Sequence, residues 1–136
     1  MKEHGFSLIE LMIVVVIVAI LAAIAVPLYT SYGKNARRTA AINALNTVAS
    51  REEGYYSRYN VYATKLTELG YDHDTVTTKG GYYDISLVSV PAPATSYTVQ
   101  AVPTSVGGQN TDKCRTFTLD SYGNKTPANI PHCWPK

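Results

Sequence analysis

Hydrophobic residues are concentrated near the start of the chain, in a block that reaches from Phe6 to Val26. Residues 11–26 read LMIVVVIVAILAAIAV without a charge, and with their flanks they supply the roughly 20 residues that a helix needs to cross a bilayer core. Glu10 lies inside this block, where an acidic side chain costs roughly 2.5 to 3.5 kcal/mol near a helix centre and less toward an end. The pattern predicts a membrane-spanning helix in which Glu10 has a functional partner.

Beyond this block, hydrophobic residues recur at spacings of three and four up to about Arg58, which is typical of an amphipathic helix. Because good helix formers flank Pro27, we expect the helix to bend near Ala23 rather than stop. The face expected to contact a core comprises Ala41, Ile42, Leu45, Val48, Ala49, Tyr55, Tyr56 and Tyr59. The opposite, polar face comprises largely Lys34, Arg37, Arg38, Asn43, Asn46 and Arg51.

Further along the chain, the hydrophobic pattern changes to period two, which predicts strands over residues 83–88, 97–101 and 115–119. The alternation slips at Leu87-Val88, which indicates a bulge or burial of both strand faces. Short connections favour antiparallel pairing. The expected fold class is therefore α+β, a long N-terminal helix whose C-terminal half packs on one small antiparallel sheet.

The sequence GFSLIE at residues 5–10, followed by an apolar helix and Pro27, resembles the class III signal of type IV prepilins. Counting from Phe6, Glu10 is the fifth residue and Pro27 the twenty-second, which are the positions that the family's motif requires. The resemblance implies cleavage between Gly5 and Phe6, N-methylation of Phe6, and a role in assembly for Glu10 and Pro27. Cleavage would leave an α-amino group on Phe6, four residues before Glu10 in the same chain. In a packed array, the Glu10 carboxylate could instead pair with the Phe6 amine of an adjacent, axially shifted subunit.

The same resemblance implies three parts of the chain: a prepilin leader peptide over residues 1–5, a transmembrane and assembly helix over residues 6–28, and a globular domain over residues 29–136. It implies a single-pass protein of the bacterial inner membrane, with its globular domain in the periplasm, that is later built into an extracellular pilus. The implied partners are the prepilin peptidase and N-methyltransferase, the other pilin subunits and the inner-membrane pilus assembly platform.

The basic residues that follow the apolar span conflict with this orientation. By the positive-inside rule, Lys34, Arg37 and Arg38 would indicate a cytoplasmic flank or contact with lipid headgroups. We follow the prepilin motif, because Lys2 alone gives the other flank little weight.

The apolar block has an alternative interpretation as a cleaved secretory signal, because residues 23–25 (Ala-Ile-Ala) resemble a small-x-small cleavage site. Three features oppose it. The residues before the block contain no basic cluster, since Lys2 is offset by Glu3; Gly5 stands directly before the apolar run; and Glu10 interrupts that run.

The chain has two cysteines, Cys114 and Cys133, and both lie in its polar portion. We expect them to form a disulfide that closes the loop 114–133 in an oxidising compartment, with two buried free thiols as the alternative. Residues 51–71 and the tail around these cysteines are similar to PilE-type minor pilins, a group that includes the DNA-uptake pilin ComP.

Catalytic and metal-binding motifs are not found, so neither an enzyme nor a cofactor is expected. Residues 72–74 (Asp-His-Asp) are interpreted as a solvated loop and residues 120–124 as a hairpin turn rather than as metal ligands. The disulfide would gather basic and aromatic side chains suited to phosphate contact and base stacking: Lys113, Arg115, Lys125, His132, Trp134 and Lys136. Because only four of these groups are permanently charged and Asp112 and Asp120 lie nearby, we favour a solvated loop that contacts neighbouring pilins over a DNA site.

The sequence therefore predicts a structural subunit of a type IV pilus, of the minor-pilin kind. Two alternatives belong to other functional classes, a DNA-binding uptake pilin and a pseudopilin of type II secretion. The paired cysteines argue against the pseudopilin, because many pseudopilins carry a calcium site in place of the disulfide.

Processing is tested by mass spectrometry of the mature N-terminus. We expect a chain that begins at N-methylated Phe6, because Gly5 precedes it and Glu10 follows at the required distance. An N-terminus at Val26, as a secretory signal peptidase would leave, or an uncleaved Met1 would contradict the prepilin interpretation.

Overall fold

The computed structural model describes residues 4–88 and 90–136, so Ser89 and the first three residues of the predicted leader lie outside it. The chain divides into two compact units, Met1–Asn35 and Ala36–Lys136. One helix, α1 (Leu8–Tyr59), contributes residues to both units.

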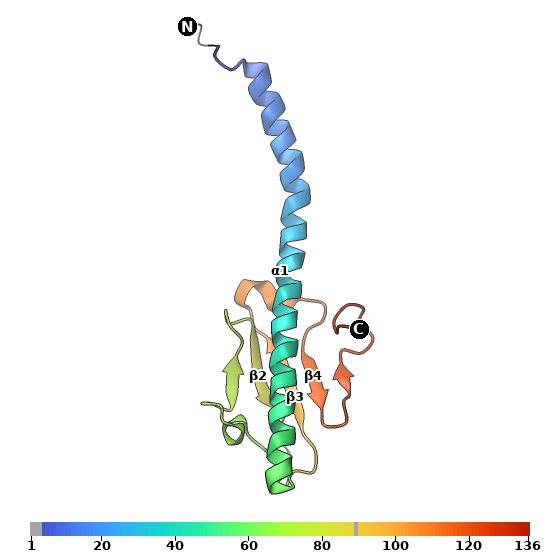
Figure 1. Cartoon of the computed structure of the whole chain (residues 1–136). Helices are drawn as coiled ribbons and strands as arrows, with labels where there is room; N and C mark the ends of the chain where they lie inside the picture. Colours follow the sequence, from blue (N-terminus) through green and yellow to red (C-terminus); the bar gives the residue numbers. More distant parts are fainter. Residues whose placement is uncertain (1–3, 89) are drawn as a thin grey trace. The chain divides into compact units, whose positions relative to one another are not determined.

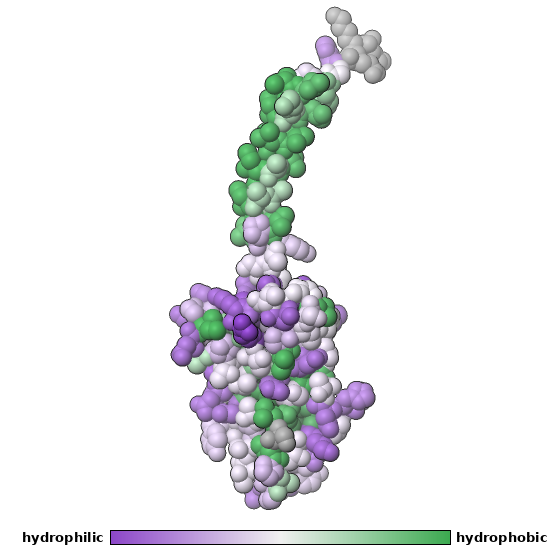
Figure 2. All heavy atoms as spheres, turned by 180° about the vertical axis from the view of Figure 1, so that it is seen from behind, coloured by the Kyte–Doolittle hydropathy of each residue, from purple (hydrophilic) through white to green (hydrophobic). Residues whose placement is uncertain are grey.

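In the first unit, α1 begins directly after Ser7, whose hydroxyl oxygen accepts a hydrogen bond from the backbone N–H of Glu10 at 3.2 Å, as an N-cap residue does. The helix continues through Pro27, as the flanking residues predict. The most apolar 18-residue stretch of α1 has none of its residues buried, although it is long and apolar enough to cross a membrane. On the face seen in Figure 2, this segment is hydrophobic along nearly its whole length.

In the second unit, the remainder of α1 packs on a five-stranded antiparallel sheet with the strand order β1-β2-β3-β4-β5 (Figure 1). The strands are β1 (Thr75–Thr77), β2 (Tyr83–Leu87), β3 (Thr98–Pro103), β4 (Phe117–Asp120) and β5 (Lys125–Thr126). Two 3₁₀ helices, η1 (Leu66–Leu69) and η2 (Val106–Thr111), lie in the connections. The expected fold class, a long helix packed on a small antiparallel sheet, is confirmed.

The core of the second unit lies between α1 and the central strands. Ile85 of β2, Ala101 of β3 and Phe117 of β4 are paired in register, and all three side chains are buried. The helix contributes Leu45 and Val48, which are also buried. The alternation of buried and half-buried residues along the strands follows from the two-residue period of an extended chain.

The three predicted strands are present, but β1 and β5 were not predicted. Each has only two or three residues and is rich in threonine, so neither can show a period-two pattern. The expected bulge or double burial at Leu87-Val88 is wrong. The register of β2 and β3 runs on without interruption, because the N–H of Val88 donates to the carbonyl oxygen of Thr98 at 2.8 Å, and the slip marks the end of the strand.

Three side chains of α1 differ in burial from the prediction. Arg38 was expected on the polar face and is only 8% exposed, whereas Tyr56 and Tyr59 were expected on the core face and are 38% and 61% exposed. The periodicity assigns charged residues to the solvent, and this assignment fails when a buried partner neutralises the charge. Glu52, for which the sequence made no assignment, is fully buried.

Candidate functional site

The residues predicted to control processing lie at the start of the first unit. Gly5 and Phe6 form a non-helical segment, and the side chain of Phe6 is 78% exposed. The bond between them is therefore accessible in the chain itself. Glu10 lies in the first turn of α1, where an anion is favoured by the helix dipole. Within the described residues, no cation contacts its carboxylate.

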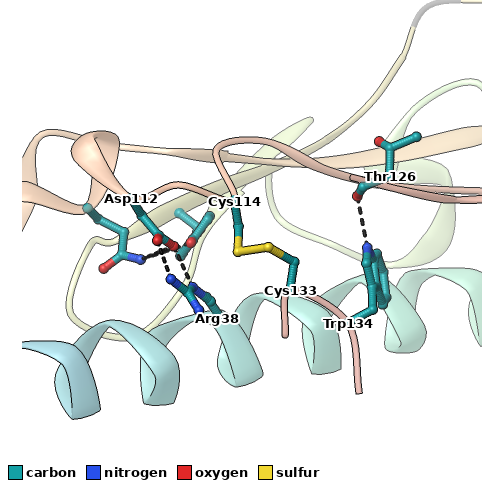
Figure 3. The surroundings of a disulfide bond; sticks show 8 residues. Arg38, Asp112, Cys114, Thr126, Cys133 and Trp134 are labelled. Atoms are coloured by element: carbon teal, nitrogen blue, oxygen red, sulfur yellow. Dashed lines mark hydrogen bonds and ion pairs between the residues drawn. A yellow bond between two sulfur atoms is a disulfide. The ribbon is translucent and has the colours of Figure 1, made fainter. Parts of the chain in front are cut away.

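In the second unit, Arg38 and Asp112 form a buried ion pair between α1 and the segment that follows η2 (Figure 3). The Nε of Arg38 donates to Asp112 Oδ2 at 2.6 Å, and its Nη2 donates to Asp112 Oδ1. These hydrogen bonds raise the pKa of Arg38 above its ordinary value. Gln109 extends the network, because its Nε2 donates to the hydroxyl of Tyr83 at 2.9 Å and to Asp112 Oδ2 at 3.4 Å. A two-pronged arginine–carboxylate contact fixes both distance and orientation.

Arg37, the residue before Arg38 on α1, also contacts η2 and the residue before β2. Its guanidinium carbon lies 3.9 Å from the centre of the Tyr82 ring, and its Nη1 donates to the carbonyl oxygen of Gly107 at 3.2 Å. Gly107 has a φ of 59°, which favours glycine, and a Cβ atom there would lie 2.7 Å from Nη1 of Arg37 and would displace the guanidinium. Arg37 and Arg38 are thus explained by contacts within the second unit, which removes the main reason to interpret them as a membrane-orienting charge.

The predicted disulfide between Cys114 and Cys133 is formed, and the alternative of two free thiols is wrong. Both residues are buried, and their Cα atoms are 5.7 Å apart. The bond attaches the C-terminal tail next to β4 (Figure 3). Trp134 strengthens this attachment, because its Nε1 donates to the carbonyl oxygen of Thr126 at 2.9 Å and its ring packs edge-on against Phe117 at 5.6 Å.

The side chains predicted to contact DNA are partly brought together. Lys113 and Arg115 are exposed on either side of Cys114, and Lys125 places its Nζ 5.2 Å from the centre of the Trp134 ring. Lys136 is exposed at the end of the chain. Trp134 is partly buried and already packed, so little of its ring is available to stack on a base.

The two acidic residues that lie near these cations in the sequence, Asp112 and Asp120, both have partners within the second unit. Asp112 is neutralised by Arg38 in the interior. Asp120 Oδ1 accepts hydrogen bonds from the N–H groups of Tyr122 and Asn124, both at 2.9 Å. These bonds and one from the Asn124 side chain hold the pKa of Asp120 below its ordinary value. The burial of Asp112 with Arg38 therefore removes one opposing charge from this region, whereas Asp120 stays ionised.

The possible metal ligands take part in ordinary turn contacts. Oδ1 of Asp74 accepts hydrogen bonds from the Oγ1 of Thr67 at 2.7 Å and from its N–H at 3.2 Å. The Asp120 carboxylate stabilises its own turn. Across residues 4–88 and 90–136, no group of three or more His, Cys, Asp or Glu side chains is placed to hold a metal ion.

One surface of α1 was missed by the sequence analysis. In the second unit, small residues occupy exposed positions separated alternately by four and three residues: Ala36, Ala40, Asn43, Thr47, Ser50, Gly54 and Ser57. We call this row the small-residue seam. A period of 3.5 residues matches the seam along which two helices pack in a coiled coil. The spacing of the small residues is visible in the sequence, but only their common exposure shows that the domain leaves this face uncovered.

Comparisons with known proteins cover nearly the whole chain. The model of the prokaryotic N-terminal methylation motif matches residues 1–26, and the model described as type IV minor pilin ComP, DNA uptake sequence receptor, matches residues 27–118.

Individual relatives agree with these matches. The chain is 32% identical to the fimbrial protein EcpC of Eikenella corrodens over 122 residues, which are 90% of this chain and 76% of that protein. It is 34% identical over 70 residues to the type IV major pilin protein PilA of Myxococcus xanthus (strain DK1622), a match that covers 52% of this chain and 32% of that protein. A solved structure of a type IV pilin from Shewanella oneidensis is similar with a TM-score of 0.58 and 29% identity, covering 76% of this chain and 99% of that one.

The Arg38–Asp112 pair is tested by removing one partner. We expect Asp112→Ala to lower the free energy of unfolding by about 3 to 5 kcal/mol, because it leaves a buried guanidinium without its counter-charge. The exposed control Asp72→Ala should change it by less than about 0.5 kcal/mol. Urea unfolding of the detergent-solubilised chain, followed by the fluorescence of its single tryptophan, measures both. Equal effects of the two substitutions would contradict the structural role of the pair.

Proposed function

The chain belongs to the type IV pilin family, in the minor-pilin group described as ComP, and on that premise we propose that its N-terminal helix is held first in the bacterial inner membrane and then inside a filament. Members of this family are structural subunits of a pilus and not enzymes. The N-terminal methylation motif indicates processing by prepilin peptidase. The matched family model describes a minor pilin, so it gives no support to the alternative of a type II secretion pseudopilin.

One observation carries the proposal: the apolar part of α1 has no covering partner in its own unit. Side chains such as Ile13, Ile17 and Leu21 are each more than half exposed. Burying one such side chain is worth about 1.5 to 3 kcal/mol, so the exposed state of the whole segment is unfavourable in water. A bilayer covers it before assembly, and the helices of neighbouring subunits cover it afterwards. Assembly is then an exchange of lipid contacts for protein contacts, with the globular domain on the periplasmic side until that exchange.

Glu10 sets the axial position at which two neighbouring subunits pack in the filament. Cleavage between Gly5 and Phe6 creates a cation at the new N-terminus, and an apolar surrounding strengthens its attraction to a carboxylate. A neighbouring subunit can place its Phe6 amine against Glu10 only at one axial shift, because the rest of the span offers no other charge. Leader peptide residues 1–5 would block this contact until the peptidase removes them.

The small-residue seam supports the same mode of assembly. Because its side chains are small, they protrude little from the exposed face of α1 between residues 36 and 57, so a second helix can approach closely there. The partner that we propose is another pilin subunit.

The role of Glu10 is tested by Glu10→Ala. We expect the variant to lose efficient incorporation into filaments, because the Phe6 amine of the neighbour then has no counter-charge, while the globular domain stays folded. The exposed control Glu53→Ala, also on α1, should assemble normally. Immunoblots of sheared filaments against whole-cell protein give the incorporated fraction. Normal incorporation of Glu10→Ala would remove the pairing with Phe6.

DNA binding is a second candidate function, and one observation favours it. The family model named for a DNA uptake sequence receptor matches residues 27–118, which include Lys113 and Arg115. Their exposed side chains lie beside a disulfide that also holds the tail with Lys136 nearby in sequence. With Asp112 paired in the interior, the cations of this region can approach phosphate groups with less acidic opposition.

This second function is tested by titrating the domain that begins at Leu28 with duplex DNA at low and at physiological salt. If the surface binds phosphates, log K should fall by roughly 0.9 per unit of log salt for each phosphate that is neutralised. The substitutions Lys113→Ala/Arg115→Ala and Lys125→Ala/Lys136→Ala should each weaken binding, whereas the control Lys65→Ala/Lys79→Ala should not. Binding that is undetectable at low salt, or that neither pair of substitutions weakens, would leave the structural role alone.

A further inference from the structure

Glu52 is a buried acid that the filament role does not use. It lies on α1 in the second unit, and its exposed fraction is 0%. Its Oε2 accepts a hydrogen bond from the backbone N–H of Ala63 at 2.9 Å. Its Oε1 is also buried and has no hydrogen-bond partner within the described residues, where no ion pair to Glu52 is found either. A carboxylate in this position has one hydrogen bond and no counter-charge.

The groups that face Glu52 make its negative charge still less favourable. They are Glu53 and Tyr55 on α1, Tyr62 in the connection that follows, Glu68 in η1, and Tyr97 immediately before β3. All of them are acidic or phenolic. Burial raises the pKa of Glu52 to about 7, and the charges of Glu68 and Glu53 act in the same direction.

The hydrogen bond to Ala63 attaches a specific segment to α1. We call residues 60–65, between the end of α1 and η1, the α1–η1 connection. Ala63 is buried, and the adjacent Tyr62 forms a bridge to Ala94, with 2.9 Å between its N–H and the carbonyl oxygen. The ring of Tyr62 packs against Tyr56 at 4.7 Å and against Tyr97 at 5.0 Å. Glu52 therefore lies under the point where the connection, the helix and this aromatic cluster meet.

We propose that Glu52 is a proton-operated latch: when its carboxyl group is protonated the α1–η1 connection is held on α1, and when it is ionised the connection opens. Ionisation leaves a buried charge with an unpartnered oxygen, and opening relieves this cost by admitting water. The neutral acid removes the charge and can still accept the hydrogen bond from Ala63. Opening would separate Tyr62 from its two aromatic neighbours, so the surface that these tyrosines form would respond to pH.

The sign of the pH dependence follows from linkage. The closed state binds the proton more tightly than the open state, in which Glu52 returns to its ordinary pKa of 4.5. The stabilisation of the closed state is therefore complete below about pH 4.5, is lost as the pH rises through about 7, and changes little above that.

Amide hydrogen exchange of the detergent-solubilised full chain tests the latch. After correction for the intrinsic exchange rate, the opening constant of the connection at Ala63 should rise by up to about tenfold per pH unit between pH 5 and 7 and level off above. The buried strand β2 should not share this dependence. In Glu52→Gln, which cannot ionise, the opening constant at Ala63 should be independent of pH. In the control Glu53→Gln, whose amide oxygen can still accept from Tyr62, the dependence should persist.

An identical pH dependence in the parent chain and Glu52→Gln, or none in the parent chain, would overturn the proposal. If Glu52→Gln does not fold, infrared titration of the parent chain still decides. One carboxyl group should keep its protonated C=O band at pH 6, and the absence of any protonated carboxyl at that pH would rule the latch out.

Discussion

The rest of this structure depends on one constraint: the apolar part of α1 has no covering partner in its own unit. A helix that is hydrophobic all round is stable in a bilayer or inside a bundle of helices and not in water. In the proposed function, the chain therefore passes from the bilayer to the bundle of helices without exposing the apolar segment to water. We propose that the single carboxylate in the apolar stretch, Glu10, and the amine that cleavage would create four residues earlier fix the axial position at which this passage ends. In the proposed function, membrane anchoring and filament assembly both follow from the same uncovered helix.

The second unit has to remain folded while the first changes its surroundings, and its sheet is small. Its edge strands β1 and β5 contain only three and two residues, so the hydrogen-bond ladder alone gives them little stability. Two contacts outside the hydrogen-bond ladder add to the stability of this unit. The buried pair of Arg38 and Asp112 holds the η2 region to α1, and the disulfide with Trp134 holds the tail to β4 and β5. Of the two, only the disulfide is covalent, so it also restricts the unfolded chain, whereas the ion pair stabilises the folded state alone.

Features that depend on local pattern could be predicted from the sequence, and features that depend on distant partners could not. The apolar block, the GFSLIE motif and the three longer strands are each visible within a short window of residues. The disulfide was predictable because two cysteines allow only one pairing within the chain. Arg38 was assigned to the solvent because its partner lies 74 positions away. Glu52 gave no signal, since an acid in a helix is normally exposed, and its burial follows from the connection that folds over it.

The central claim is that the apolar segment is covered throughout the life of the protein, first by lipid and then by other subunits. Its most direct test is the reaction of Ile17→Cys, in the middle of the span, with a water-soluble maleimide in membranes and in intact filaments. The exposed turn residue Lys79, replaced by cysteine, provides the reference rate. The account predicts rapid labelling at position 79 in both states and labelling at position 17 only after the filament or membrane is dissolved in denaturing detergent. Labelling at position 17 in intact filaments at the rate seen at position 79 would contradict it.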